Sequence, residues 1–128
     1  MIILRTHPDY IAKVVEHSMH ALASGPKISP GDLILISQTV AQTDDGLPAI
    51  RYVMEFDRLR ADRTGEISKR IWGRSWPYVV YGKNCRQLAR PFNMSDIQVS
   101  SHQYGQGGPY VYVAPQDEAV LLNSGLLA

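Results

Sequence analysis

The first regular pattern in the chain is a run of apolar residues at helical spacing, formed by Ile11, Val14, Val15, Met19 and Leu22. Thr6 before this run can cap a helix, and Pro8 is tolerated in a first turn. The Gly-Pro pair at residues 25–26 can end the element. We therefore predict a helix that begins at Thr6 and runs through Leu22, covering one side of a core.

The middle of the chain predicts two strands. Residues 33–36 are a continuous apolar run after a Pro-Gly-Asp turn, which indicates a central buried strand, although periodicity alone also allows a helix. Apolar and polar residues alternate over residues 50–57, as in a half-buried strand. The polar residues 42–48 between them predict a loop or hairpin connection.

The second half of the chain predicts shorter elements. They are a loop with a short helix capped by Thr64 over residues 62–71, strands at 78–81 (closed by Gly82), 97–99 and 110–113, a loop at 104–109, and a helix from 115 towards 125. Short strands with glycine-bearing turns, and no strand–helix–strand alternation, favour a small curved or closed sheet. We predict an α+β fold, a small mixed sheet or barrel flanked by helices, in a single domain over residues 1–128.

Composition narrows the class of protein. The chain has 128 residues, enough for one domain with its own core. It contains no apolar stretch near the roughly 18 residues that span a bilayer, and its first residues do not resemble a signal peptide. Cys85 is the only cysteine, so an internal disulfide or a cysteine zinc cage is excluded. We expect a cytoplasmic protein that uses no metal or other cofactor and does not enter the membrane.

The net charge of +1 hides an asymmetry along the chain. Residues 51–90 hold ten basic side chains against four acidic ones, a net +6, and the rest of the chain is at −5. Residues 69–90 contain no acidic residue and six basic ones, Lys69, Arg70, Arg74, Lys83, Arg86 and Arg90. The run is either a surface that meets an anion such as phosphate, which suits the arginine fork, or a cationic surface with no specific ligand.

Aromatic residues gather inside this basic run. Residues 71–81 hold four of the eleven Trp, Tyr and Phe residues of the chain, including both tryptophans. Gly73 and Pro77 make a regular helix unfavourable there, so we predict that Trp72 and Trp76 lie on a loop that enters a strand. Two indoles on one loop can face each other across a planar ligand such as a base. The alternative is that both rings simply pack in the core or at its rim.

The order of elements and motifs resembles the PUA-like superfamily, and within it the YTH and EVE group. The resemblance is carried by the opening helix, the Pro-Gly-Asp-Leu turn, the strand Ile-Arg-Tyr-Val-Met-Glu-Phe at 50–56, the paired-tryptophan segment Arg-Ile-Trp-Gly-Arg-Ser-Trp at 70–76, and the segments 77–88 and 90–98. It covers most of the chain. It implies a PUA-like fold and a non-catalytic reader that takes a flipped, modified base into an aromatic cage.

The resemblance also implies which residues would carry this function. Trp72 and Trp76 would be cage walls, Tyr78 and Tyr81 are candidates for a third wall, and Thr6 and the segment 21–24, which ends at Ser24, would contact the base. The backbone contacts would come from Lys69, Arg70, Arg74, Lys83, Arg86 and Arg90. Similar prokaryotic domains are often joined to nuclease or GTPase modules, which implies the recognition module of a modification-dependent restriction system. DNA or RNA, and the kind of modification, stay open.

Two other functions remain open at this point. The first is a small PUA-like hydrolase or nucleotide-processing enzyme that uses His7, Asp9, His17 or His20. The second is a protein-interaction adaptor whose aromatic and arginine side chains bind another protein, because Trp, Tyr and Arg dominate such contacts. An enzyme needs histidines and a carboxylate converging in a cleft. A reader needs both indoles in one pocket beside arginines, and an adaptor needs a flat exposed patch.

Overall fold

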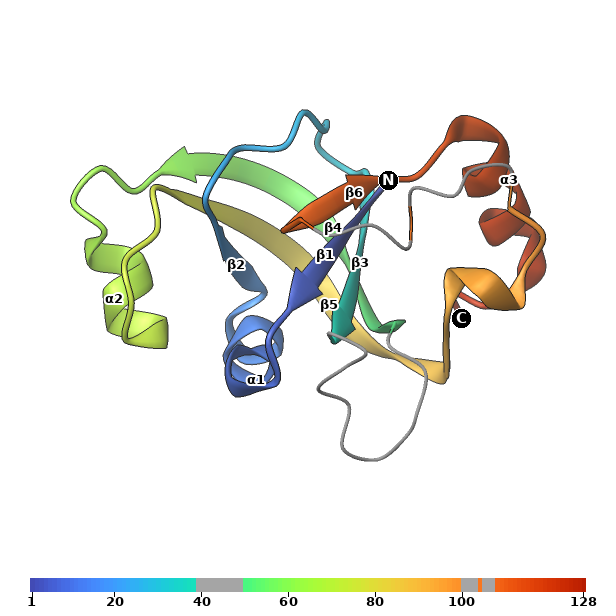
Figure 1. Cartoon of the computed structure of the whole chain (residues 1–128), viewed down its shortest axis with the longest axis horizontal. Helices are drawn as coiled ribbons and strands as arrows, with labels where there is room; N and C mark the ends of the chain where they lie inside the picture. Colours follow the sequence, from blue (N-terminus) through green and yellow to red (C-terminus); the bar gives the residue numbers. More distant parts are fainter. Residues whose placement is uncertain (39–49, 100–103, 105–107) are drawn as a thin grey trace.

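The chain folds around one curled mixed sheet of six strands (Figure 1). The computed structural model describes residues 1–38, 50–99, 104 and 108–128. The elements are, in chain order, β1 (Ile2–Thr6), α1 (Pro8–His17), β2 (Met19–Leu22), β3 (Leu33–Gln38), β4 (Ile50–Ala61), α2 (Glu66–Trp72), β5 (Tyr78–Phe92), the 3-10 turn η2 (Met94–Asp96), β6 (Tyr110–Tyr112) and α3 (Pro115–Ser124). The predicted α+β class with a curved mixed sheet is confirmed. The connection predicted at 42–48, and residues 105–107 of the loop predicted at 104–109, lie outside the described residues.

The strand order β2-β5-β4-β3-β1-β6 places the longest strands in the middle of the sheet. β1 runs parallel to β3, and the other neighbouring pairs are antiparallel. Successive strand residues point to opposite faces, so Ile34 and Ile36 join one hydrophobic cluster while Leu35 joins the other. Burial on both faces explains why residues 33–36 form an unbroken apolar run.

The N-terminal part of the chain departs from the sequence prediction. Thr6 ends the strand β1, and the helix cap is His7, whose Nδ1 accepts a hydrogen bond from Asp9 N–H at 3.1 Å. The helix stops at His17 because Ser18 takes a left-handed conformation, with φ 52°. Residues 19–22 then form β2, which pairs with Tyr78–Tyr81 of β5. The apolar spacing predicted one long helix, but the sheet buries the last residues of the run instead.

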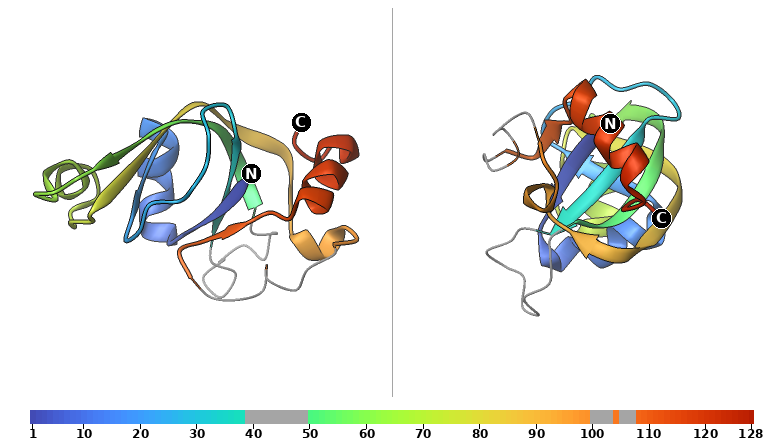
Figure 2. Two further views of the ribbon diagram at one scale, coloured as in Figure 1. Left: turned by 90° about the horizontal axis from the view of Figure 1, so that it is seen from above. Right: turned by 90° about the vertical axis from the view of Figure 1, so that its right-hand side faces the viewer.

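The hairpin of β4 and β5 is longer than predicted. Gly82 does not end the second strand, because β5 continues through it to Phe92. A Cβ atom at Gly82 would lie 2.5 Å from Met54 Sδ, so the glycine marks a close approach inside the sheet. Residues 97–99, predicted as a weak strand, are not in a strand. The views in Figure 2 show α2 at the far end of this hairpin, away from α3.

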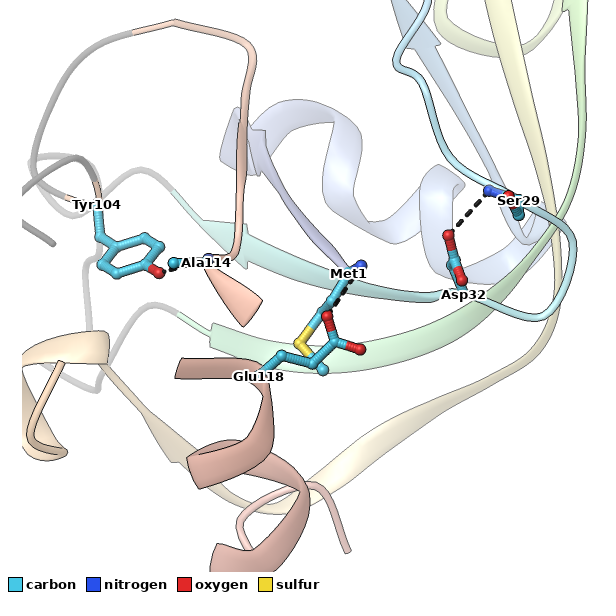
Figure 3. A network of polar contacts seen from close by, with 6 residues as sticks. All are labelled: Met1, Ser29, Asp32, Tyr104, Ala114 and Glu118. Atoms are coloured by element: carbon cyan, nitrogen blue, oxygen red, sulfur yellow. Dashed lines mark hydrogen bonds and ion pairs between the residues drawn. The ribbon is translucent and has the colours of Figure 1, made fainter. Parts of the chain in front are cut away.

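The C-terminal helix is held against the sheet by polar contacts (Figure 3). Tyr104 Oη accepts a hydrogen bond from Ala114 N–H at 3.0 Å and donates one to Asp117 Oδ2 at 2.6 Å. The Met1 amino group lies 3.7 Å from the Glu118 carboxylate. The helix predicted from residue 115 is confirmed, with Gly125 in the left-handed conformation after its end.

The two outer strands of the sheet, β2 and β6, are not paired with each other. Three hydrogen bonds that involve side chains instead join β2 and the segment after it to β1 and β6: Thr6 Oγ1 to His20 Nε2 at 2.9 Å, Ser24 Oγ to Tyr110 Oη at 3.3 Å, and Lys27 N–H to Tyr112 Oη at 2.9 Å. We call this line of contacts the seam. The sheet is therefore a half-barrel. Hydrogen bonds of side chains, rather than pairing between two strands, connect its two edges.

In the part of the chain that the structure describes, no helix has the length and apolar character needed to cross a membrane.

Candidate functional site

A cavity of about 200 Å³ opens beside the seam, between α1, β2 and the end of α2. Its lining comes from segments that are far apart in the sequence: Arg5, Thr6, His7, Tyr10, Val14, His20, Ala21, Leu22, Ala23, Trp72, Trp76 and Pro109. Tyr10 and Val14 are four residues apart on α1, so they share one helix face. The cavity thus lies where the first helix covers the open side of the half-barrel.

Three aromatic rings form one corner of the cavity, which we call the aromatic corner: Tyr10, Trp72 and Trp76. The Trp72 and Trp76 rings lie 6.3 Å apart with their planes at 86°, and the Tyr10 and Trp76 rings lie 5.6 Å apart at 87°. The two indoles do not face each other as parallel plates, so the expectation of a ligand sandwiched between them needs correction. A planar ligand can stack on one of these rings and meet the edge of another.

A buried hydrogen-bond chain positions the tryptophans. Trp72 is the last residue of α2, and Gly73 ends the helix with a positive φ of 78°. Asp62, only 4% exposed, accepts hydrogen bonds from Ser68 N–H and Ser68 Oγ at 2.9 and 2.8 Å. Ser68 Oγ in turn accepts from Trp76 N–H at 2.8 Å. The helix prediction is therefore correct in outline, but Asp62 rather than Thr64 supplies the start of the helix with an acceptor.

Trp72 carries an unmatched polar atom. Its side chain is 8% exposed, and among the described residues its Nε1–H is a buried donor with no hydrogen-bond acceptor. A buried donor left without a partner costs about 1–3 kcal/mol. The core-packing interpretation and the cavity interpretation of Trp72 both apply, because the ring belongs to the core cluster and also lines the cavity.

Thr6 and His20 are polar residues of the cavity lining and contact each other. Thr6 Oγ1 lies 2.9 Å from His20 Nε2, and His20 Nδ1 lies 2.9 Å from the carbonyl oxygen of Ala21. Burial lowers the pKa of His20 from the ordinary 6.5 to about 4, although the hydrogen bond to Ala21 opposes that change. The imidazole is therefore neutral at pH 7.

Cationic side chains border the cavity on two sides. Arg5 lines it and donates to the carbonyl oxygens of Gly108 and Tyr104 at 3.2 and 2.9 Å, which fixes the chain just before β6. The Arg74 guanidinium lies 5.3 Å from the centre of the Trp76 ring. The exposed residues Lys69 and Arg70 are in the last turn of α2.

The structure brings only some of the predicted site residues to the cavity. Thr6, Trp72 and Trp76 line it, and so do residues 21–23. Ser24 lies at the seam, and Tyr78 and Tyr81 lie on β5, none of them among the lining residues.

The predicted backbone-contacting residues fall into two groups. Lys69, Arg70 and Arg74 belong to α2 and the turn after it. Lys83, Arg86 and Arg90 lie further along β5, beyond its pairing with β2, and Arg86 donates to the Leu127 carbonyl.

Sequence reasoning missed three side chains of the site. Tyr10 had a usable signal, because it lies one turn before Val14 on the same helix face. Arg5 carried no pattern of its own. His20 was considered only as a helical residue, so its pairing with Thr6 could not be foreseen.

The residues of the enzymatic alternative do not all meet. His7 and His20 line the cavity, Asp9 lies 3.5 Å from His7, and His17 is exposed at the end of α1. No carboxylate is among the described lining residues. Within the ranges that the structure describes, no group of three or more His, Cys, Asp or Glu side chains is arranged to hold a metal ion.

No known family profile and no curated protein sequence matches the chain. The fold is similar to solved structures of ASCH from Zymomonas mobilis. The structure of ASCH itself has a TM-score of 0.64 at 8% identity, covering 94% of this chain and 92% of the other. Two mutant proteins of ZmASCH each give a TM-score of 0.66, at 7% and 9% identity, covering 94% and 96% of this chain and 95% and 94% of theirs. At this identity the similarity shows the fold alone: it agrees with the PUA-like fold that the resemblance implied and does not test the YTH and EVE group.

Proposed function

We propose that this chain is a nucleic-acid-binding domain that holds one base, turned out of its strand, in the cavity at the aromatic corner. One observation carries the proposal: Trp72, Trp76 and Arg5 line the same small cavity, and Arg74 stacks on Trp76 at its edge. A flat aromatic patch, which a protein-interaction adaptor would need, is not what these residues form.

The size of the cavity suits a single heterocycle. Its volume of about 200 Å³ is below the roughly 300–1,000 Å³ of pockets for drug-sized ligands. Turning a base out of its stack costs a few kcal/mol. Stacking on an aromatic side chain returns about 1–3 kcal/mol per base, and phosphate contacts add to it. Of the two indoles, Trp76 is the better placed for stacking, because it is half-buried whereas Trp72 is buried.

Cationic side chains near the cavity would hold the strand on either side of the base. Lys69, Arg70 and Arg74 are exposed beside the aromatic corner and would contact phosphates without reading sequence. Lys83 and Arg90 are exposed further along β5 and would extend this surface. Affinity should then fall steeply with salt.

The finer proposal is that the base is modified, as in YTH- and EVE-type readers. Val14, Ala21 and Leu22 give the cavity an apolar side that can take a methyl group. Burying one methyl carbon is worth about 0.8 kcal/mol, which is less than tenfold in affinity. Stronger discrimination requires that an unmodified base also lose hydrogen bonds to water on entering the cavity.

We also propose that the domain binds and does not catalyse, and that it serves as the recognition module of a modification-dependent restriction system, joined to or working with a nuclease or GTPase module. The neutral His20 is a weak base at pH 7, and the described lining lacks a carboxylate. We expect that bound oligonucleotides remain intact and release no product during prolonged incubation. Cleavage or base conversion that requires His20 would overturn the non-catalytic part of the proposal.

Fluorescence anisotropy with short single-stranded DNA and RNA, carrying one methylated or unmethylated base, tests the binding function. We expect Trp76→Ala to abolish the preference for the modified base and Trp76→Phe to keep part of it, because a phenyl ring still stacks. Arg74→Ala should weaken all oligonucleotides alike and reduce the salt dependence. Equal affinity for modified and unmodified oligonucleotides, unaffected by Trp76→Ala, would refute the cavity as a base site.

A further inference from the structure

The hydrogen bonds of His20 determine what Thr6 can offer a ligand. A carbonyl oxygen only accepts, so the 2.9 Å contact to Ala21 places the ring proton of His20 on Nδ1. Since the buried ring is neutral, its Nε2 is an acceptor. The tautomer thus follows from one backbone contact.

Thr6 must donate its only hydroxyl proton to this ring. Its Oγ1 lies 2.9 Å from His20 Nε2, and an acceptor nitrogen needs a donor opposite it. Thr6 is 1% exposed and His20 is 8% exposed, so the contact between them is buried, although both residues line the cavity. Having donated that proton, the Thr6 hydroxyl can only accept a further hydrogen bond.

We propose that Thr6 and His20 make their part of the cavity lining accept a hydrogen bond without donating one, so that it selects a base that directs an N–H group at Thr6. The inference rests on the proposed function and gives it a rule of specificity. An exocyclic amino group satisfies the rule with or without one methyl group, because one N–H remains. A dimethylated amino group or a carbonyl oxygen in the same place fails it.

The apolar side chains that line the cavity together with Thr6 do not relax the rule. Val14 and Leu22 are buried and apolar, so they offer no hydrogen bond. Arg5 uses two of its five N–H donors on the carbonyl oxygens of Gly108 and Tyr104. A base carbonyl facing Thr6 would meet a lone pair with no proton between them, which leaves an acceptor unsatisfied and should cost about tenfold in affinity.

The test uses single-stranded oligonucleotides that differ at one base. One set carries adenine, N6-methyladenine, N6,N6-dimethyladenine or hypoxanthine, and the other carries cytosine, its N4-methyl and N4,N4-dimethyl forms, or uracil. In the set that binds, we expect the dimethylated and carbonyl bases to bind about tenfold more weakly than the bases that keep an N–H.

Three variants and a control separate specificity from folding. Thr6→Ser should keep the discrimination, and Thr6→Val should lose it because the acceptor is gone. His20→Leu should release the Thr6 proton, so binding of the carbonyl base should rise towards that of the amino base, a gain that damage to the fold would not give. Thr64→Val, in the exposed turn before α2, should match the unchanged chain.

The outcomes distinguish this inference from the function beneath it. Binding that depends on Trp76 but is equal for amino, dimethylamino and carbonyl bases would overturn the rule and leave the proposed function standing. Absence of binding to every oligonucleotide would overturn both. If Thr6→Val fails to fold, as seen by circular dichroism, the comparison of bases on the unchanged chain decides alone.

Discussion

Burial keeps the imidazole of His20 neutral, and this lowers the stability of the folded chain in acid. Its pKa falls from 6.5 to about 4 on folding, so between these pH values the unfolded chain binds a proton that the folded chain does not. The contribution of the neutral His20 to the free energy of unfolding is therefore fully present above pH 6.5 and decreases as the pH falls towards 4. Burial raises the pKa of Asp62, but hydrogen bonds from Ser68 and Ile67 outweigh burial and hold the pKa below its ordinary 3.8. Protonation of Asp62 therefore reduces the stability only at a lower pH than protonation of His20 does.

We expect the free energy of unfolding to drop by about 3 kcal/mol between pH 7 and pH 4 because of His20. Urea titrations at several pH values measure this. His20→Asn should flatten the decrease, whereas His17→Asn, at an exposed position, should leave it as it is. A flat profile in the unchanged chain would contradict the buried neutral ring.

The residue scale also shows the limit of sequence reasoning about the site. Trp72 and Trp76 could be found from their spacing and their basic surroundings. His20 could not, because the apolar spacing extends the helix through it and only the left-handed Ser18 ends the helix earlier. Any residue type adopts that conformation at a cost, so a serine gives little warning of it.

At the scale of elements, the hydrogen-bond chain from Asp62 through Ser68 to Trp76 determines where the aromatic corner lies. Asp62 precedes α2, Ser68 is inside it, and Trp76 follows it. Since all three are joined through one buried hydroxyl, the short helix and the loop after it behave as one unit. The sequence placed a short helix here, but the bond between Ser68 and Trp76 depends on how the chain returns after Gly73.

Ser68→Ala removes the hydroxyl, so Trp76 N–H loses its acceptor and Asp62 Oδ2 loses one of its two donors, keeping the backbone N–H of residue 68. We expect a loss of about 1–3 kcal/mol in stability and a shift of tryptophan fluorescence, because Trp76 becomes more mobile. Chemical denaturation followed by fluorescence measures both. Ser75→Ala is the matched control, because Ser75 is an exposed residue whose hydroxyl donates to the Gly65 carbonyl oxygen; an effect as large there would argue against the role of the hydrogen-bond chain.

Gly82 shows why β5 is longer than its pattern predicts. Glycine normally interrupts a strand, but here the nearby Met54 Sδ fills the place of a side chain. That contact joins residues distant in sequence, so no local pattern contains it.

Gly82→Ala should cost about 1–3 kcal/mol by overpacking, since its Cβ would lie 2.5 Å from Met54 Sδ and 3.1 Å from the Glu55 carbonyl oxygen. Combining it with Met54→Ala should cost less than the two single changes together. Thermal melting of the three variants measures this coupling. If the stability losses of the two single variants simply add, the cost of Gly82→Ala comes from the backbone conformation of residue 82 and not from the contact with Met54.

At the scale of the whole molecule, the fold class was predictable and the topology was not. Alternation over 50–57 and the apolar run at 33–36 marked central strands, and the glycine turns indicated a curved sheet. No strand was predicted over residues 2–6, where Thr6 was predicted as a helix cap, although this segment pairs with β3 and β6. Pairing between residues 2–6 and 33–38 is a long-range choice that local patterns do not encode.

The seam has a consequence for how a ligand enters and leaves the cavity. Each of its bonds joins two side chains or a side chain to one amide, so breaking one of them leaves the β2–β5 ladder intact. Opening along this line should therefore need far less free energy than unfolding the domain. We expect the amide hydrogen of Lys27 to exchange with deuterated solvent much sooner than those of β3, and sooner still in Tyr112→Phe. If deuterium uptake at Lys27 is as slow as in β3, the seam does not open locally, and exchange requires unfolding of the whole domain.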